Sequence, residues 1–403
     1  MKRAAEKYVV VLADGCADFP LESLGGRTPL EAAATPALDA LAAEGVVGQI
    51  NPIPPQLSPG SDVGNLTVLG YDPLRYLTGR APLEAAARGV SLGPDQVAFR
   101  CNLITLKDGR ILDYSAGHIS SEEAAELIEA LRGALESEEI RFYPGVQYRH
   151  LMVAPRAWGN VQTTPPHDVP GEPYVEHLPR GEAAERLIEL IHRSWEVLQE
   201  HPVNAKRRAA GKGEANSIWL WGQGTAPQMP PYPKKYGLQG GVISAVDLVR
   251  GIGRYAGLEP IPVEGITGFL DTNYAGKAIE GLRALQEGLD FVYIHVEAPD
   301  EAAHLGDPQA KIQAIEAIDR EIVSRVLEFK MRNPHCRVAV LPDHITSVAT
   351  RTHVRGRVPF VAAGAGLTSN GIGRFSEIAA TGSELDFGEG YRWMDWFLGV
   401  EAD

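Results

Sequence analysis

The sequence predicts an α/β protein with a largely parallel sheet, helices on both faces of that sheet, and a smaller α+β domain inserted into it. Short apolar runs alternate with helix-like stretches over most of the 403 residues, which is the order of a parallel sheet with helical crossovers. Three of those runs lead into Asp or His, where open α/β sheets gather their ligands. From residue 77 to residue 175 the pattern changes to strands joined by tight turns, which indicates a separate inserted domain.

Composition and charge narrow the class of protein. With 44% hydrophobic and 22% charged residues, the chain resembles an ordinary soluble globular protein. Its formal charge of −14 argues against nucleic acids and anionic membranes as partners, and no apolar run approaches the roughly 20 residues that span a bilayer. Three scattered cysteines without a CxxC pair, and the lack of a cleavable signal at the N-terminus, favour the cytoplasm.

Residues 1–76 are expected to form the first part of the core domain. The apolar run Tyr8–Ala13 reads as a buried strand, and Pro36–Glu44 reads as a helix with proline at its first position. A proline-rich loop then leads to Ser61, which lies near the start of a helix predicted over residues 63–70. Backbone amides and the helix dipole make such a start a favourable place for an anion.

Residues 77–175 are expected to form the inserted α+β domain. Val97–Leu106 reads as a strand, and Lys107–Arg110 reads as a hairpin turn. An amphipathic helix with glutamates in its first turn follows over Ser121–Leu135, and Val146–Ala154 returns to strand.

Residues 176–403 are expected to complete the core domain with further alternation of helix and strand. The predicted helices are Glu182–Glu200, Val246–Ala256, Tyr274–Glu287 and Pro308–Lys330. The predicted strands are Gly241–Ser244, Ile261–Val263, Phe291–Val296, Arg337–Leu341 and Pro359–Ala363. Helices at these positions would cover both faces of one sheet.

Seven residues with metal-binding or nucleophilic side chains lie at or after the predicted strand ends: Asp14, Ser61, Asp300, His304, Asp343, His344 and His353. Asp300 and His304 are four residues apart, so both can reach one ion from one helical face. Carboxylate and imidazole without thiolate suit Mn²⁺ or Zn²⁺, with Mg²⁺ in an oxygen-richer site. Seven groups favour two ions, an arrangement suited to phosphoryl transfer. Taken singly, each residue has an ordinary alternative as a helix cap, a surface pair or a loop residue, and their shared placement favours the metal site.

Several motifs together resemble a known family. They are Asp14 after the first strand, Pro59-Gly60-Ser61-Asp62, Leu69-Gly70-Tyr71-Asp72-Pro73, the run from His295 to His304, Pro342-Asp343-His344 and Thr352-His353. The sequence resembles the archaeal type of cofactor-independent phosphoglycerate mutase, within the alkaline phosphatase superfamily, over essentially its whole length. The resemblance implies interconversion of 3-phosphoglycerate and 2-phosphoglycerate, Ser61 as the phosphorylated nucleophile, two divalent metals and no 2,3-bisphosphoglycerate cofactor. It implies one metal held by Asp14, Ser61, Asp343 and His344, and another held by Asp300, His304 and His353.

The same resemblance implies that the inserted domain, residues 77–175, clamps the substrate. It implies contacts to a small anionic phosphorylated substrate from Arg80, His118, Arg149, His150 and Arg207. Pro165-Pro166-His167-Asp168 also matches the family and receives no role. The segment Asn216–Gly224 is more similar to a bacterial branch proposed to act as a homoserine kinase. The alternatives are therefore a homoserine kinase-like phosphotransferase, a metal-dependent phosphatase or phosphonate hydrolase, and a non-enzymatic metal-binding module.

Overall fold

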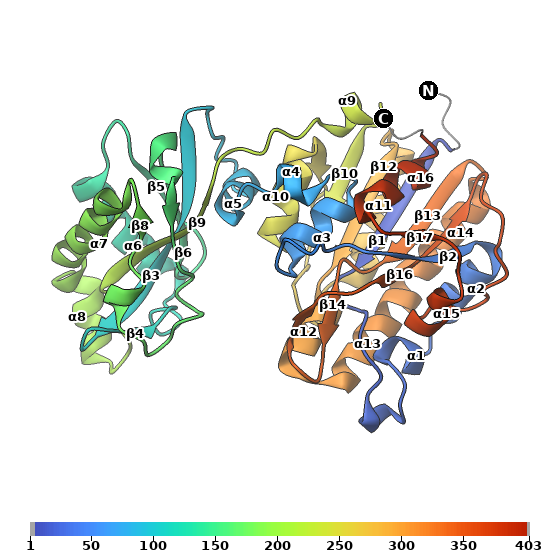
Figure 1. Cartoon of the computed structure of the whole chain (residues 1–403), viewed down its shortest axis with the longest axis horizontal. Helices are drawn as coiled ribbons and strands as arrows, with labels where there is room; N and C mark the ends of the chain where they lie inside the picture. The colour runs from blue at the N-terminus through green and yellow to red at the C-terminus, as the bar shows by residue number, and fades with distance from the viewer. Residues whose placement is uncertain (1–4, 401–403) are drawn as a thin grey trace. The chain divides into compact units, whose positions relative to one another are not determined.

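The computed structural model describes residues 5–400, which fall into two compact units (Figure 1). Unit 1 is formed by Met1–Leu77 and Gln228–Asp403, and unit 2 by Thr78–Pro227. The inserted domain was expected to end at residue 175, but unit 2 continues to Pro227. The reason is strand pairing over a long sequence distance: β9 (Ser217–Gly224) pairs with β3 (Gln96–Lys107) and so belongs to the sheet of the insert.

In the described part of the chain, unit 1 contains one sheet of eight strands. Their order is β11 (Leu258–Pro260), β10 (Gly240–Ile243), β12 (Phe291–Val296), β1 (Lys7–Ala13), β13 (Cys336–Leu341), β16 (Val358–Gly364), β2 (Val46–Ile50) and β17 (Asp386–Phe387). Within this sheet, β16 alone runs opposite to its neighbours, and the other pairings keep one direction. The predicted α/β class with a largely parallel sheet is confirmed.

Helices cover both faces of this sheet, because alternate side chains of its strands point to opposite sides. On one face, Val9 and Val11 of β1 join a core with α2 (Pro36–Glu44), α11 (Tyr274–Gln286), α13 (Pro308–Ile318) and α14 (Ser324–Arg332). On the other face, Tyr8 donates a hydrogen bond to the carbonyl of Leu398 at the end of α16 (Trp393–Leu398). Also on that face, Tyr293 donates to Asn65 of α3 (Ser61–Val68).

One predicted strand of unit 1 is misplaced. The strand expected over Ile261–Val263 lies three residues earlier, as β11. Pro262 has no N–H group for a ladder hydrogen bond, so the strand ends before it. The helix expected over Pro308–Lys330 is present, with a π-helical turn at Asp319–Val323 between α13 and α14.

The other helices and strands of unit 1 are short. They are α1 (Pro29–Ala32), α4 (Pro73–Tyr76), α9 (Tyr232–Lys235), α10 (Asp247–Tyr255), α12 (Ala298–Leu305), α15 (Glu377–Thr381), β14 (Ile345–Ser347) and β15 (Thr352–Val354). No helix within residues 5–400 combines the length and apolar character that crossing a membrane would require.

Unit 2 has an antiparallel sheet around its long strand β3. Along this strand β3 pairs with β6 (Arg149–Pro155), β9 and β4 (Arg110–Asp113), and β5 (Arg141–Tyr143) pairs with β6. The helices of unit 2 are α5 (Arg80–Ala87), α6 (Ser121–Leu135), α7 (Ala184–Gln199) and α8 (Pro202–Ala209), and β7 (Val161–Gln162) pairs with β8 (Arg180–Gly181).

The two faces of the unit 2 sheet differ in character. Phe99 and Cys101 of β3 point to a core shared with apolar residues of α6 and α7. The alternate residue Arg100 points to the other face, where its guanidinium lies 4.1 Å from the ring centre of Trp221. This second face is therefore the one that carries charged and aromatic groups.

Candidate metal centre and substrate-binding face

Three neighbouring parallel strands of unit 1 bring the predicted metal ligands together. β1 pairs in parallel with β12 on one side and with β13 on the other, so the carboxyl ends of the three strands meet at one edge. Asp14 follows β1, and Asp343 and His344 follow β13. Asp300 lies on α12, which follows β12 directly. The sheet therefore brings these predicted ligands together at the carboxyl ends of its strands, as expected.

The first group, called cluster A here, consists of Asp14, Ser61, Asp343 and His344. Its centre is His344 Nε2, which lies 3.2 Å from Ser61 Oγ, 3.5 Å from Asp14 Oδ1 and 3.4 Å from Asp343 Oδ2. Asp14, Asp343 and His344 are almost fully buried. Ser61 is partly exposed at the first position of α3, so its hydroxyl meets both the cluster and the helix start.

The second group, cluster B, consists of Asp300, His304 and His353. His304 Nε2 lies 3.3 Å from Asp300 Oδ2 and 3.0 Å from His353 Nε2, and His353 Nε2 lies 3.4 Å from Asp300 Oδ1. The hairpin of β14 and β15 supplies His353, opposite Thr346 in its register. The Nδ1 atom of His304 lies 3.0 Å from the carbonyl oxygen of Arg351, which leaves Nε2 directed at the cluster.

The residues present fit divalent cations. Asp14 Oδ1 is buried and has no hydrogen-bond partner among residues 5–400, although it lies within the group formed by Asp14, Asp343 and His344. Burial raises the pKa of Asp14 well above its ordinary value, and the charges of Asp343 and Asp300 raise it further. An unpaired carboxylate oxygen among crowded carboxylates and imidazoles is what a cation would satisfy.

Two glycines allow the close packing around these clusters. Gly15 has a φ of +59°, and a Cβ there would lie 2.6 Å from Asp300 Oδ1. A Cβ on Gly64 of α3 would lie 2.4 Å from the carbonyl oxygen of Asp343. Both contacts are too short for a real Cβ, so the approach of the Asp14 loop to α12, and of α3 to the Asp343 loop, requires glycine.

Buried polar residues that received no role in the sequence analysis hold the candidate ligands in place. His295 Nε2 lies 2.8 Å from Asp14 Oδ2, while its Nδ1 lies 3.0 Å from Ser244 Oγ. Burial lowers the pKa of His295 to about 3, so the ring is neutral and donates one hydrogen bond to Asp14. A histidine within the apolar strand β12 is the sequence signal that could have revealed this role.

Asn65 plays a comparable part on the other side of cluster A. Its Nδ2 donates to the carbonyl oxygen of Ser61 at 2.9 Å and to Asp343 Oδ2 at 2.8 Å. Its Oδ1 accepts from the hydroxyl of Tyr293 at 2.8 Å. The buried amide therefore links the backbone of Ser61 to a carboxylate of the same cluster.

In unit 2, the charged face of the sheet carries Arg149 together with Arg100, which the sequence analysis missed, and His167, to which it assigned no role. Arg149 of β6 lies over the ring of Tyr148, with 5.3 Å between the guanidinium carbon and the ring centre. Arg100 and His167 belong to the same face, because His167 lies 5.1 Å from the ring of Trp221, on which Arg100 stacks. The available signal was the pair Arg100 and Asn102 within the apolar run Val97–Leu106, because residues two apart share one face of a strand.

His150 does not fit the expected substrate contact. Neighbouring residues of a strand point to opposite faces, so His150 faces the helix-covered core while Arg149 faces away from it. The side chain is 1% exposed, and its Nδ1 accepts a hydrogen bond from the backbone of Gly145 at 3.0 Å. Burial lowers its pKa to about 3. We correct this expectation: His150 is a neutral buried residue.

Arg207 does not fit a substrate contact either. Its guanidinium, 2% exposed, pairs with Glu123 at 2.5 Å and donates to the carbonyl oxygens of Ala116 and Gly213 at 2.6 and 2.7 Å. Each of the three guanidinium nitrogens of this buried arginine in α8 contacts an acceptor of its own unit, so Arg207 supports the loop at Ala116. The basic run suggested exposure, but helix geometry turns this arginine inward.

His118 and Arg80, two further predicted substrate contacts, are both exposed. His118 is exposed at the end of a loop in which Ala116, Gly117 and His118 have φ values of +50°, +65° and +48°. Such backbone strain in non-glycine residues concentrates at functional sites. Arg80 is exposed at the first position of α5, and its charge acts on Arg100 and His167.

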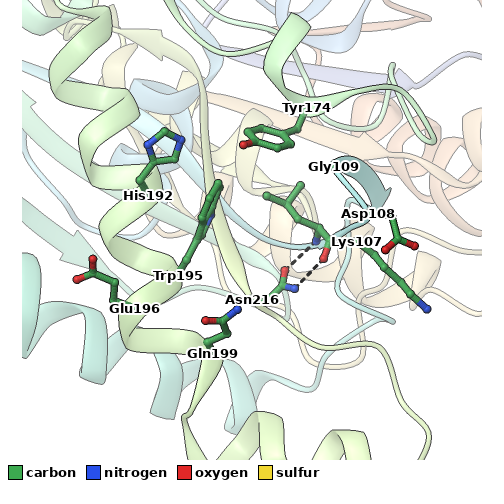
Figure 2. Close-up of a pocket in the computed structure, with 10 residues that line it drawn as sticks. Lys107, Asp108, Gly109, Tyr174, His192, Trp195, Glu196, Gln199 and Asn216 are labelled. Atoms are coloured by element: carbon green, nitrogen blue, oxygen red, sulfur yellow. Dashed lines mark hydrogen bonds between the residues drawn. The ribbon is translucent and has the colours of Figure 1, made fainter.

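Unit 2 also has a surface hollow of about 550 Å³ that contains none of the predicted site residues (Figure 2). Its wall includes Tyr174, His192, Trp195, Glu196, Gln199 and Asn216. The side chain of Asn216 accepts from the N–H of Leu106 and donates to its carbonyl, at 2.7 Å each, and Trp195 donates to Ser217. These polar groups hold the sheet and helices of unit 2 together.

Comparisons with known proteins agree on one family. The family model described as 2,3-bisphosphoglycerate-independent phosphoglycerate mutase matches residues 42–204. A protein of that name from Methanosarcina mazei is 53% identical over 88% of this chain and 89% of its own. A probable member from Geobacter sulfurreducens is 49% identical over 97% of this chain and 99% of its own.

Solved structures resemble the whole fold. The cofactor-independent phosphoglycerate mutase of Thermoplasma acidophilum aligns with a TM-score of 0.69 and 27% identity, over 98% of this chain and 99% of its own. A protein from Pyrococcus horikoshii aligns with a TM-score of 0.83 and 29% identity, over 99% of both chains. The likeness extends over both units of the chain.

Proposed function

The chain belongs to the 2,3-bisphosphoglycerate-independent phosphoglycerate mutase family, an isomerase family, and on that premise we propose that Ser61 is its phosphorylated nucleophile. The proposed reaction interconverts 3-phosphoglycerate and 2-phosphoglycerate in the cytoplasm. The observation that carries the role of Ser61 is its hydroxyl 3.2 Å from His344 Nε2, at the start of α3 and in the cluster that holds the unpaired oxygen of Asp14.

Two divalent ions, with Mn²⁺ preferred over Zn²⁺ or Mg²⁺, are part of the proposal. Cluster A would hold one ion through Asp14, Ser61, Asp343 and His344, and cluster B would hold the other through Asp300, His304 and His353. When bound, such ions lower the pKa of a coordinated hydroxyl and neutralise the charge of phosphate oxygens. Carboxylates and imidazoles without thiolates match the preferences of these metals.

The protein residues organise the transfer itself. Ser61 Oγ forms a bond to phosphorus while the bond from phosphorus to the glycerate oxygen breaks, and the proton of the serine hydroxyl ends on the departing oxygen. The amides in the first turn of α3 favour the anionic phosphoryl group beside Ser61. In the second half of the reaction the other glycerate hydroxyl takes the phosphoryl group, and Ser61 recovers its proton.

Substrate recognition is proposed for the charged face of unit 2. Arg149 and Arg80 are the proposed anion-binding residues, and His118 is the proposed contact from the strained loop. The guanidinium group suits a carboxylate or phosphate because it donates two parallel hydrogen bonds. Arg100 joins this proposal because it lies on the same face and is held in place by Trp221 and Glu84.

A direct comparison of substrates tests this function. Purified protein with Mn²⁺ is given 3-phosphoglycerate, with enolase coupling to detect 2-phosphoglycerate, or homoserine with ATP, with detection of phosphohomoserine. We expect 2-phosphoglycerate only, with no requirement for 2,3-bisphosphoglycerate. Phosphohomoserine as the product would establish the kinase alternative, and free phosphate with glycerate would establish a phosphatase.

A further inference from the structure

The hydroxyl of Thr346 lies between the two clusters. Thr346 is fully buried in β14, and its Oγ1 is 2.5 Å from Asp300 Oδ1 of cluster B and 3.0 Å from His344 Nδ1 of cluster A. One side chain therefore contacts a ligand in each cluster without belonging to either set of predicted ligands.

The direction of these two hydrogen bonds follows from what each group can donate. An ionised carboxylate only accepts, so the hydroxyl proton of Thr346 points to Asp300. The hydroxyl oxygen then accepts from His344, which requires the imidazole proton on Nδ1. The lone pair of Nε2 consequently faces cluster A, where Ser61 Oγ lies 3.2 Å away.

The hydroxyl has little freedom to turn elsewhere. The backbone N–H of Thr346 donates to the carbonyl of Ala17 at 3.2 Å, and its carbonyl accepts from the ammonium of Lys311 at 2.7 Å. Gly15 packs so tightly against it that a Cβ there would lie 2.5 Å from Thr346 Oγ1. Both the backbone and the surroundings of the side chain are thus fixed.

We propose that Thr346 is a positioning residue that couples the two metal sites, through one hydroxyl that orients Asp300 and sets the tautomer of His344. This inference rests on the proposed two-metal function and deepens it. An ion in cluster B would order Asp300, and Asp300 in turn would fix the Thr346 hydroxyl that orients His344 toward an ion in cluster A. An ion in cluster A would likewise order His344 and, through the same hydroxyl, Asp300. A purely structural threonine would stabilise the fold without linking the two affinities.

The variants for the test are Thr346→Val, which removes the hydroxyl at nearly constant shape, and Thr346→Ser, which retains it. The matched control is Thr272→Val, because Thr272 is also buried and its hydroxyl accepts from the N–H of Thr267, away from the clusters. Calorimetric titration of the metal-stripped full chain with Mn²⁺ measures both affinities. Loss of an outer hydrogen-bond partner of a metal ligand typically weakens metal binding by about 10–100-fold.

We expect Thr346→Val to weaken the binding of both Mn²⁺ ions by about that factor. Thr346→Ser and Thr272→Val should bind both ions with wild-type affinity. In the wild-type background, His304→Ala should also lower the affinity of cluster A for its ion. In the Thr346→Val background, His304→Ala should lower the affinity of cluster A no further. Wild-type affinity in Thr346→Val, or a loss confined to cluster B, would overturn the coupling.

A second measurement needs neither metal nor a folded variant. In the ¹⁵N-histidine NMR spectrum of the metal-stripped wild-type chain, we expect His344 to carry its proton on Nδ1, and a proton on Nε2 would overturn the inference. The proposed function fails separately. Wild-type protein that binds two coupled ions without forming 2-phosphoglycerate would refute the mutase proposal and leave the role of Thr346 intact.

Discussion

Replacing Lys311 with methionine should destabilise the protein strongly, because this lysine is a buried cation with three protein acceptors. Lys311 on α13 is 0% exposed, and its ammonium contacts Asp18 Oδ2 at 2.9 Å, the carbonyl of Ala17 at 3.1 Å and the carbonyl of Thr346 at 2.7 Å. Methionine has nearly the same length, so the substitution removes the charge and leaves the carboxylate of Asp18 buried without a counter-charge. Breaking a buried pair in this way costs about 3–5 kcal/mol.

Urea denaturation followed by circular dichroism measures this loss. In the double variant with Asp18→Asn no buried charge is left unpaired, so it should lose clearly less than the two single variants added together. Lys330→Met is the matched control, because its partner Glu44 has a side chain that is 53% exposed and such pairs contribute about 0–1 kcal/mol. Equal losses in Lys311→Met and Lys330→Met, or strict additivity in the double variant, would refute the reasoning.

Two further predictions address pH dependence and the two arginines. Burial raises the pKa of Glu377 to about 7 from an ordinary 4.5, so the folded state holds a proton that the unfolded state loses. The contribution of Glu377 to the free energy of unfolding is complete below pH 4.5 and falls as the pH rises to 7. In urea titrations between pH 5 and 8, Glu377→Gln should remove up to about 3 kcal/mol of that fall. Parallel curves of unfolding free energy against pH for the wild type and the variant would contradict this. Arg149→Gln should raise the KM for 3-phosphoglycerate by about 10–100-fold with little change in Tm, whereas Arg207→Gln should lower Tm; the reverse pattern would contradict the assignment of the two faces.

The grouping of the candidate metal ligands was predictable from the sequence because parallel strands impose a simple rule. Asp14, Asp300 and Asp343 follow three apolar runs, and the carboxyl ends of parallel neighbours meet at one edge. The rule requires no knowledge of the order of the strands beyond their being adjacent. It does not reveal residues that act from within a strand, and so the contact of His295 with Asp14 was not predicted.

The boundary and the binding residues of unit 2 were harder to predict for physical reasons. The pairing of β9 with β3 joins residues more than a hundred positions apart, and no local pattern encodes such a contact. His150 and Arg207 were chosen for their chemistry, whereas burial is decided by strand alternation and by helix packing. Alternation alone would have separated Arg149 from His150, because adjacent residues of a strand face opposite sides.

The central claim is that Ser61 carries the phosphoryl group within a metal cluster. Because other residues also bind the metal, the cluster should keep its ion without the Ser61 hydroxyl. The most direct test measures conversion of 3-phosphoglycerate to 2-phosphoglycerate, together with bound metal, in wild-type protein and in Ser61→Ala. We expect the variant to lose the activity while its metal content stays nearly intact, because Asp14, Asp343 and His344 remain. Equal activity in Ser61→Ala would contradict the account.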